Sequence, residues 1–175
     1  MRDQPNIIIT GTPGVGKTTH CEMLAQNTGL THLSINQISK EQDIRETYDE
    51  ELKTWIVDED KVVDAVMDKL EVGGYLVDWH ACDMFPERLI DLVVVLRVDS
   101  TLLYDRLKAR DYPEVKLQEN LDCEIMEVLL DEARENYAEE VVVELRSDTT
   151  EEIEANIERI EAWIKQWKED HANKA

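Results

Sequence analysis

Residues 11–18 read GTPGVGKT and match the pattern G-x-x-x-x-G-K-[ST] at each fixed position. An apolar run, residues 7–9, precedes them, and a helix-forming segment follows. Glycines let the backbone wrap closely around an anion with its N–H groups pointing inward, and the next helix directs its positive N-terminal end at the same anion. The stretch therefore predicts a phosphate-binding loop, or P-loop, between a buried strand and a helix.

The rest of the chain alternates short apolar runs with helical patterns. Continuous apolar runs are typical of strands buried on both faces of a parallel sheet. We expect such strands at residues 7–9, 31–34, 74–77, 92–96 and 141–143. We expect helices at residues 17–27, 59–71, 100–110 and 116–138, and a last helix capped by Asp148 or Thr149 with an apolar face from Ile153 to Trp167. Strand–helix alternation with right-handed crossovers predicts a doubly wound α/β fold.

Length and charge limit the function. The 175 residues predict one domain, and the net charge of −21 disfavours binding to nucleic acid or to anionic membranes, so a macromolecular partner is expected to be basic. The N-terminus lacks the apolar stretch of a signal peptide, and the longest apolar runs are far shorter than a membrane span. The three cysteines are widely spaced, which disfavours a disulfide framework or a zinc site and predicts a soluble intracellular protein.

The P-loop predicts specific phosphate chemistry. Lys17 is expected to bridge the β- and γ-phosphates of a nucleotide, and the Thr18 hydroxyl is expected to ligate Mg²⁺. The apolar run 74–77 ends at Asp78, which would hold Mg²⁺ directly or through water, as a Walker B aspartate does. The N-K-x-D run of GTPases is absent, and the chain is too short for the modules of a motor protein. These features favour a kinase-like nucleotide-binding fold.

Several further segments are specific enough to indicate a family. They are GTPGVGKTT (11–19), YDEE (48–51), DED (58–60), VDWHACDMFPER (77–88) and NLDCEI (120–125). Over nearly the whole chain, these segments resemble the adenylate kinase isoenzyme six family, also called the coilin-interacting nuclear ATPase. The P-loop is shared with many proteins, whereas the pattern D-x-H-x-C-D-x-F-P-E-R is much more discriminating.

The resemblance implies a P-loop NTPase fold of three αβα layers with a five-stranded parallel sheet. It implies a single adenylate-kinase-like domain, residues 1–175, with a monophosphate-binding segment at 34–57 and a short lid at 109–119. It implies Mg²⁺-dependent phosphoryl transfer from ATP to AMP or another nucleoside monophosphate, together with ATPase activity. It also implies a location in nucleus and cytoplasm, binding to a basic small-subunit ribosomal protein and a part in 18S rRNA maturation. We expect a monomer.

The resemblance also assigns site residues. The catalytic set is Lys17, Asp78, His80 and Arg110, the nucleotide-binding set is Gly14, Gly16, Lys17, Thr18, Thr19 and Arg110, and the metal ligands are Thr18 and Asp78. His80 resembles the active-site histidine of the family and could orient a water or bond a phosphate oxygen. Arg106 and Arg110 lie four positions apart on one expected helix face, where they could clamp the transferring phosphoryl group or, for Arg106, form a surface ion pair.

The chain departs from related patterns on the acceptor side. Larger adenylate kinases carry an arginine in D-G-F-P-R where this chain has Asp78 to Cys82, so Arg88 is considered as a substitute. Residues 111–138 supply one arginine, Arg134. Lys40 stands where the G-D-L-x-R pattern of the family has arginine, which keeps the charge but loses the bidentate fork and predicts weaker AMP binding.

Two alternatives to a nucleoside monophosphate kinase remain open. One is an ATPase assembly factor that acts on a basic ribosomal protein and has weak AMP kinase activity. The other is a kinase of a small-metabolite hydroxyl group, which would need a carboxylate base such as Asp78 or Asp83. The acidic stretches 41–51 and 131–140 are interpreted as solvated helix faces or partner surface, and the cysteines as small buried apolar groups.

Overall fold

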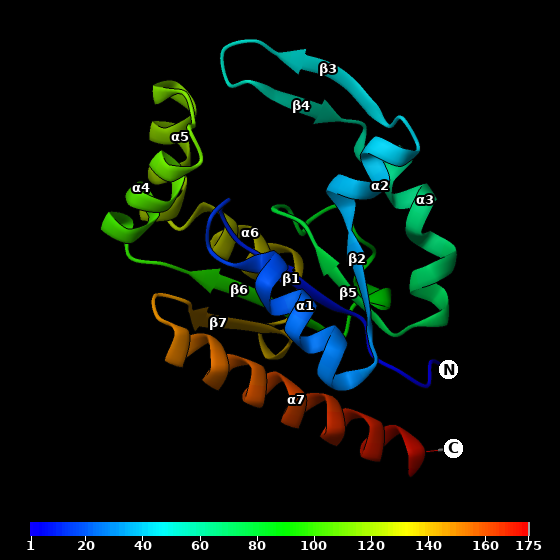
Figure 1. Ribbon diagram of the computed structural model, residues 1–175. Coiled ribbons are helices and arrows are strands. Elements are labelled where there is room, and N and C mark those ends of the chain that lie inside the picture. Colours follow the sequence, from blue (N-terminus) through cyan, green and yellow to red (C-terminus); the bar gives the residue numbers. More distant parts are fainter. Residues whose placement is uncertain (175) are drawn as a thin grey trace.

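A computed structural model describes residues 1–174, which form a five-stranded parallel sheet in the order β2-β5-β1-β6-β7 (Figure 1). The strands are β1 (Ile7–Thr10), β2 (Thr31–Ser34), β5 (Tyr75–Asp78), β6 (Leu92–Arg97) and β7 (Val142–Arg146). The central strand β1 pairs with β5 on one side and β6 on the other. The apolar runs predict all five strands and the parallel sheet, and both are confirmed.

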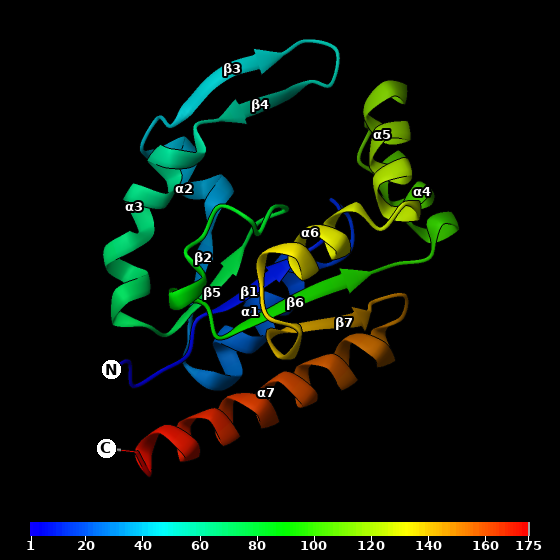
Figure 2. The same cartoon turned by 180° about the vertical axis from the view of Figure 1, so that it is seen from behind.

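Helices cover both faces of the sheet (Figures 1 and 2). They are α1 (Lys17–Thr28), α3 (Glu59–Val72), α6 (Val128–Asn136) and α7 (Thr150–Ala172). Ile7 and Ile9 of β1 pack in one core cluster with α1 and α7, whereas Ile8 packs in a second cluster with α3 and α6. Because successive strand residues face opposite ways, one short apolar strand supplies both cores. The three-layer αβα arrangement is therefore confirmed.

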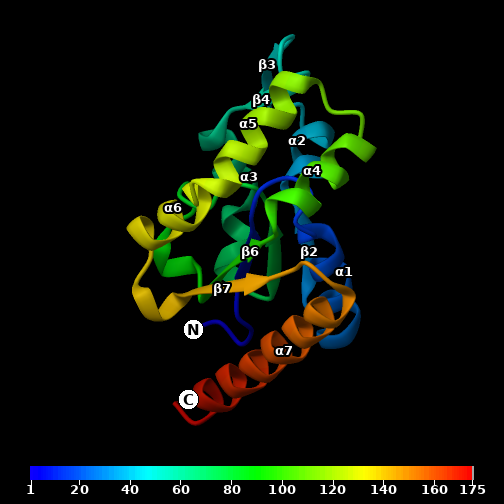
Figure 3. The same cartoon turned by 90° about the vertical axis from the view of Figure 1, so that its left-hand side faces the viewer.

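Two projections flank the end of the sheet where β1 meets the P-loop. One consists of α2 (Ile35–Glu41) and an antiparallel hairpin, β3 (Arg45–Asp49) with β4 (Thr54–Val57). The other consists of α4 (Ser100–Ala109) and α5 (Glu114–Ile125). Figure 3 shows both projections at the end of the molecule that lies away from the chain termini. They contain residues 34–57 and 109–119, whose assignment as monophosphate-binding segment and lid stays a prediction.

Two expectations about local structure are wrong. The segment 116–138 is not one helix: α5 ends at Ile125, and Glu127 adopts a left-handed backbone with φ of 57° before α6 begins. This break lets α5 pack beside α4 while α6 returns to β6. The acidic stretch 41–51 is not a helix face either, because its residues 45–49 form β3, and its other interpretation, a partner surface, stays a prediction.

The remaining elements are two single 3₁₀ turns, Glu87–Leu89 and Glu139–Val141. The last helix begins as expected, since the Glu152 N–H donates to the Thr149 hydroxyl over 3.1 Å. Among the helices of residues 1–174, none has the length and apolarity that crossing a bilayer would require.

Candidate nucleotide-binding site

The P-loop leaves β1 and enters α1 through a left-handed backbone at Gly16, where φ is 98°. A Cβ at Gly16 would be strained at this φ. Gly16 is also the N-cap residue of α1, and glycine brings no side chain to occupy the first N–H groups of the helix. These N–H groups and the helix dipole are therefore available to a phosphate.

Lys17 is the first residue of α1 and lies against the loop that precedes it. Its ammonium donates hydrogen bonds to the carbonyl oxygens of Gly11, over 2.7 Å, and Thr12, over 3.2 Å. Burial lowers the pKa of Lys17 to about 8, with Asp78 opposing this shift and Arg110 adding to it. A phosphate would raise this pKa again, because an anion stabilises the ammonium.

Thr18 and Asp78 meet on the other side of the P-loop. The Thr18 hydroxyl donates to Asp78 Oδ2 over 2.8 Å, and His32 Nε2 lies 2.9 Å from the same oxygen. Asp78 is the last residue of β5 and is buried, so the parallel register of β1 and β5 brings it to the loop. The hydroxyl and carboxylate oxygens of Thr18 and Asp78 are hard ligands of the kind Mg²⁺ prefers, and the pair therefore fits that ion.

His80 follows β5 directly and faces the same space. Its ring lies over Trp79, with ring centroids 4.0 Å apart. Its side chain is open to water from the cavity, yet the cavity walls displace much of the bulk solvent. This desolvation, together with the charge of Lys17, lowers the pKa of His80 to about 4. His80 is thus a neutral imidazole near pH 7, able to donate one hydrogen bond and accept another.

The two arginines of α4 have different surroundings. Arg110 ends the helix and lines the cavity beside the P-loop. Arg106 instead donates to the carbonyl oxygens of Gly14, over 3.0 Å, and of Ser147 and Asp148, each over 3.2 Å. The structure thus directs Arg106 to the backbone, where it fastens the P-loop to the loop before α7. Neither the expected phosphoryl clamp nor a surface ion pair describes it.

The cavity has a volume of about 630 Å³ and lies between the two projections. It is lined by residues predicted for the site (Gly14, Gly16, Lys17, Thr18, Thr19, Asp78, His80 and Arg110), by Lys40 of α2, and by Trp55 and Lys116 of the projections. The structure therefore brings all the predicted site residues together, and their individual roles stay predictions.

Two other arginines lie elsewhere. Arg88 forms an exposed ion pair with Glu71 over 3.2 Å and lines a separate pocket near the N-terminus, so it does not replace the missing acceptor arginine. Arg134 on α6 lies 3.7 Å from Glu144. Of the cations considered for the acceptor side, Lys40 is the one that lines the cavity.

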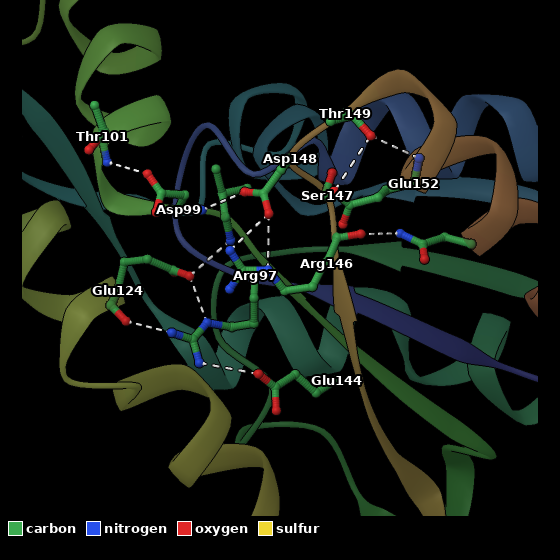
Figure 4. Close-up of polar contacts among 12 residues, drawn as sticks. Arg97, Asp99, Thr101, Glu124, Glu144, Arg146, Ser147, Asp148, Thr149 and Glu152 are labelled. Atoms are coloured by element: carbon green, nitrogen blue, oxygen red, sulfur yellow. Dashed lines mark hydrogen bonds and ion pairs between the residues drawn. The ribbon is translucent and has the colours of Figure 1, made fainter.

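A buried polar network beneath the P-loop was not expected from the sequence. Arg97 Nε donates to Glu124 Oε1 over 2.6 Å, and the Thr12 hydroxyl donates to Glu124 Oε2 over 2.7 Å. Figure 4 shows Arg97 extending between Glu124 and Glu144. The sequence does contain a signal for this network: Arg97 ends the otherwise apolar strand β6. A charge at a buried strand end needs a partner of opposite charge.

The fold and this site define a P-loop protein of the kinase-like class. Residues 7–127 match the family model described as AAA domain. Among solved structures, shikimate kinase from Bacteroides thetaiotaomicron aligns with a TM-score of 0.59 at 17% identity, covering 93% of this chain and 99% of that one. A gluconokinase from Sinorhizobium meliloti aligns with a TM-score of 0.56 at 18% identity, covering 91% of this chain and 95% of that one. At these identities, the two likenesses show the fold alone.

Comparison with curated proteins finds relatives whose sequences are much more similar to this chain than those of the two kinases. The chain is 55% identical to adenylate kinase isoenzyme 6 homolog HBR1 of Candida albicans (93% of this chain, 70% of that protein) and 49% identical to the homolog of Schizosaccharomyces pombe (97% of each). It is 51% identical to homolog FAP7 of Saccharomyces cerevisiae, over 95% of this chain and 85% of that protein. The chain belongs to the adenylate kinase isoenzyme 6 family, and the resemblance drawn from the sequence is confirmed.

Proposed function

We propose that this protein is a Mg²⁺-dependent nucleoside monophosphate kinase that converts ATP and AMP to two ADP and also hydrolyses ATP. The observation that carries the proposal is the single cavity in which Lys17, the Thr18–Asp78 pair, His80 and Arg110 converge. A nucleoside monophosphate is already an oxyanion near neutral pH, so its transfer needs positioning and charge neutralisation rather than a general base.

Each side chain has a distinct task in this proposal. Lys17 leaves the Gly11 and Thr12 carbonyl oxygens to bind the β- and γ-phosphates, and the α1 N–H groups hold the phosphates in place. Thr18 and Asp78 would hold Mg²⁺, which when bound neutralises charge on the phosphates. Arg110, which lines the same cavity, binds the transferring group.

His80 supports the hydrolytic side of the proposal. As a neutral imidazole it accepts a hydrogen bond from a water or donates one to a phosphate oxygen without changing charge. Trp79 holds its ring from one side. His80 therefore orients water when the acceptor is absent, which gives ATP hydrolysis.

The alternative, an ATPase assembly factor with weak AMP kinase activity, is favoured by the composition of the acceptor side. Among the described residues that line the cavity, Arg110 is the one arginine, and the acceptor side has Lys40 in place of a bidentate fork. We infer that the working partner in this case is a basic small-subunit ribosomal protein, encountered in nucleus and cytoplasm during 18S rRNA maturation. The net charge of −21 supports a basic partner.

A coupled assay distinguishes the two activities. ATP turnover is measured with AMP, with CMP, with the basic partner protein, and with ATP alone, using Lys17→Ala as the control. ADP formed from ATP and AMP well above the control supports the kinase, and no such excess contradicts it. Stimulation by the partner that falls with rising salt supports the assembly factor, and salt-insensitive or absent binding of the partner contradicts it.

A further inference from the structure

Three side chains with different donor atoms meet at one side of Asp78. Cys21 comes from α1, His32 from β2 and Asp78 from β5, and one ligand atom of each lies within 4.8 Å of the other two. His32 Nε2 is 2.9 Å from Asp78 Oδ2. Cys21 is fully buried and the Asp78 side chain is 8% exposed, whereas that of His32 is 22% exposed and gives the cluster access to solvent.

A thiolate, an imidazole and a carboxylate together suit zinc rather than magnesium, because Mg²⁺ prefers oxygen ligands. We propose that Cys21, His32 and Asp78 form a zinc site, with water or the Thr18 hydroxyl as the fourth ligand. Zinc bonds of about 2.0–2.3 Å in a tetrahedron separate the ligand atoms by roughly 3.5 Å, so a small inward movement of the side chains completes the site.

The spacing of the cysteines predicts no zinc site, because they do not form closely spaced pairs. The cluster has a different origin: one cysteine on the helix after the P-loop meets donors from two adjacent parallel strands. His32 and Asp78 lie near each other because β2 pairs with β5, with Ser34 opposite Asp78 and His32 opposite Leu76. Strand pairing brings His32 and Asp78 together, and the packing of α1 on the sheet adds Cys21.

The charges of the cluster match a divalent cation. Asp78 brings one negative charge, and Cys21 brings a second once its proton leaves to solvent as the metal binds. Burial and the charge of Asp78 raise the pKa of the Cys21 thiol, so loss of this proton is a cost that the metal must offset. Lys17 is the cation that faces the cluster, and its ammonium is directed to the carbonyl oxygens of Gly11 and Thr12.

The site has a regulatory consequence that rests on the proposed function. Asp78 and Thr18 cannot serve zinc and Mg²⁺ at the same time, so zinc competes with Mg²⁺ and inhibits turnover of the nucleotide. Removal of zinc by a chelator restores activity, because the thiol and imidazole return to their metal-free positions.

The test measures metal binding directly on the full-length protein. Zinc is titrated in competition with a chromophoric chelator, and Co²⁺ is titrated as a spectroscopic probe of thiolate ligation. We expect Cys21→Ser and His32→Phe each to weaken zinc binding at least about tenfold, and Cys21→Ser to abolish the cobalt–thiolate absorption band. Cys82→Ser and His171→Phe are matched controls, a buried cysteine and a partly exposed histidine outside the cluster, and are expected to bind zinc as the unmodified protein does.

Zinc binding of equal strength in the unmodified protein and in a Cys21→Ser/His32→Phe double variant overturns the proposal, as does the absence of the cobalt–thiolate band. Thermal melts of the single variants confirm that each has folded. Competition separates this proposal from the function it rests on. If zinc binds through Cys21 but does not raise the Mg²⁺ concentration needed for nucleotide turnover, the zinc site stands and the assignment of Asp78 to Mg²⁺ fails.

Discussion

The Thr18 hydroxyl donates a 2.8 Å hydrogen bond to the Asp78 carboxylate, across 60 positions of sequence. This contact joins the first turn of α1 to the end of β5. It therefore predicts that the two side chains act as one unit toward a divalent cation.

Asp78→Asn keeps the shape of the side chain but removes its charge. We expect this variant to lower turnover of ATP at least about 100-fold and to raise the Mg²⁺ concentration needed for half-maximal rate. The measurement is a steady-state Mg²⁺ titration at saturating ATP. Asp64→Asn, on the exposed surface of α3, is the control and is expected to leave the titration unchanged. An unaltered Mg²⁺ dependence in Asp78→Asn would show that the cation is held elsewhere.

Lys17 predicts a pH dependence of ATP binding. Its pKa of about 8 rises when phosphates bind, so affinity is complete below pH 8 and is lost as the pH rises through 8 toward the pKa of the bound state. Between about pH 7 and pH 9, affinity is expected to fall about tenfold, with net proton uptake on binding at the higher pH. Calorimetry in buffers of different ionisation enthalpy measures this uptake. Lys17→Ala is expected to lose the uptake as well as most of the affinity.

His80 predicts the opposite result, an absence of titration. With a pKa of about 4 in the protein without nucleotide, its imidazole stays neutral from about pH 5.5 to pH 8, so it adds no step to the pH profile of kcat/KM in that range. His80→Gln is expected to reduce ATP hydrolysis about tenfold or more, since an amide positions water less well. The profile is measured for hydrolysis and for AMP-dependent transfer separately. A rate step near pH 6.5 that disappears in His80→Gln would contradict the neutral imidazole.

Arg106 of α4 and Arg110, which caps this helix, are expected to affect different properties: Arg106 the free energy of unfolding, and Arg110 the rate of transfer. Arg110→Ala is expected to lower the transfer rate about 100-fold with little change in unfolding, because Arg110 lies exposed at the cavity. Arg106→Ala is expected to lower the free energy of unfolding by about 1–3 kcal/mol, since three carbonyl oxygens lose their donor. Urea denaturation and transfer assays on both variants check the division. Equal effects of the two substitutions on both readouts would contradict it.

The network beneath the P-loop predicts that substitutions of Glu124 and Arg97 are not additive in the free energy of unfolding. Glu124→Leu alone leaves Arg97 buried without its main partner and is expected to cost about 3–5 kcal/mol of unfolding free energy. Adding Arg97→Met to Glu124→Leu is expected to recover much of this loss. The exposed pair Arg88–Glu71 is the control, expected to contribute at most about 1 kcal/mol. A double variant no more stable than Glu124→Leu alone would mean that the charge pair itself stabilises the fold.

The sequence predicts those parts of the molecule whose structure is determined by residues close together in the chain. The P-loop follows from three glycines, a lysine and a threonine in one short stretch, and the strands follow from continuous apolar runs that must be buried. Strand ends of a parallel sheet meet at one edge, so the sequence also predicts Asp78 beside the P-loop, and the structure has it there. These features need no knowledge of distant contacts.

The parts that sequence missed depend on long-range contacts. The break at Glu127 has no glycine or proline to announce it, and it arises because α5 and α6 pack against different elements. Arg106 lies four residues before Arg110, so the sequence places both on the same helical face. In the structure, however, Arg106 alone of the two donates to the loop before α7. His32 and Cys21 lie far from Asp78 in the chain. The pairing of β2 with β5 brings His32 to Asp78, and the packing of α1 against β5 brings Cys21.

Arg106 links the P-loop mechanically to the helix beside it. Its side chain joins the carbonyl oxygen of Gly14 to α4, the helix that leads directly into residues 109–119. A swing of that segment that turned α4 would pull on the backbone that cradles the phosphates. Any such movement would therefore be coupled, through Arg106, to the shape of the backbone that cradles the phosphates.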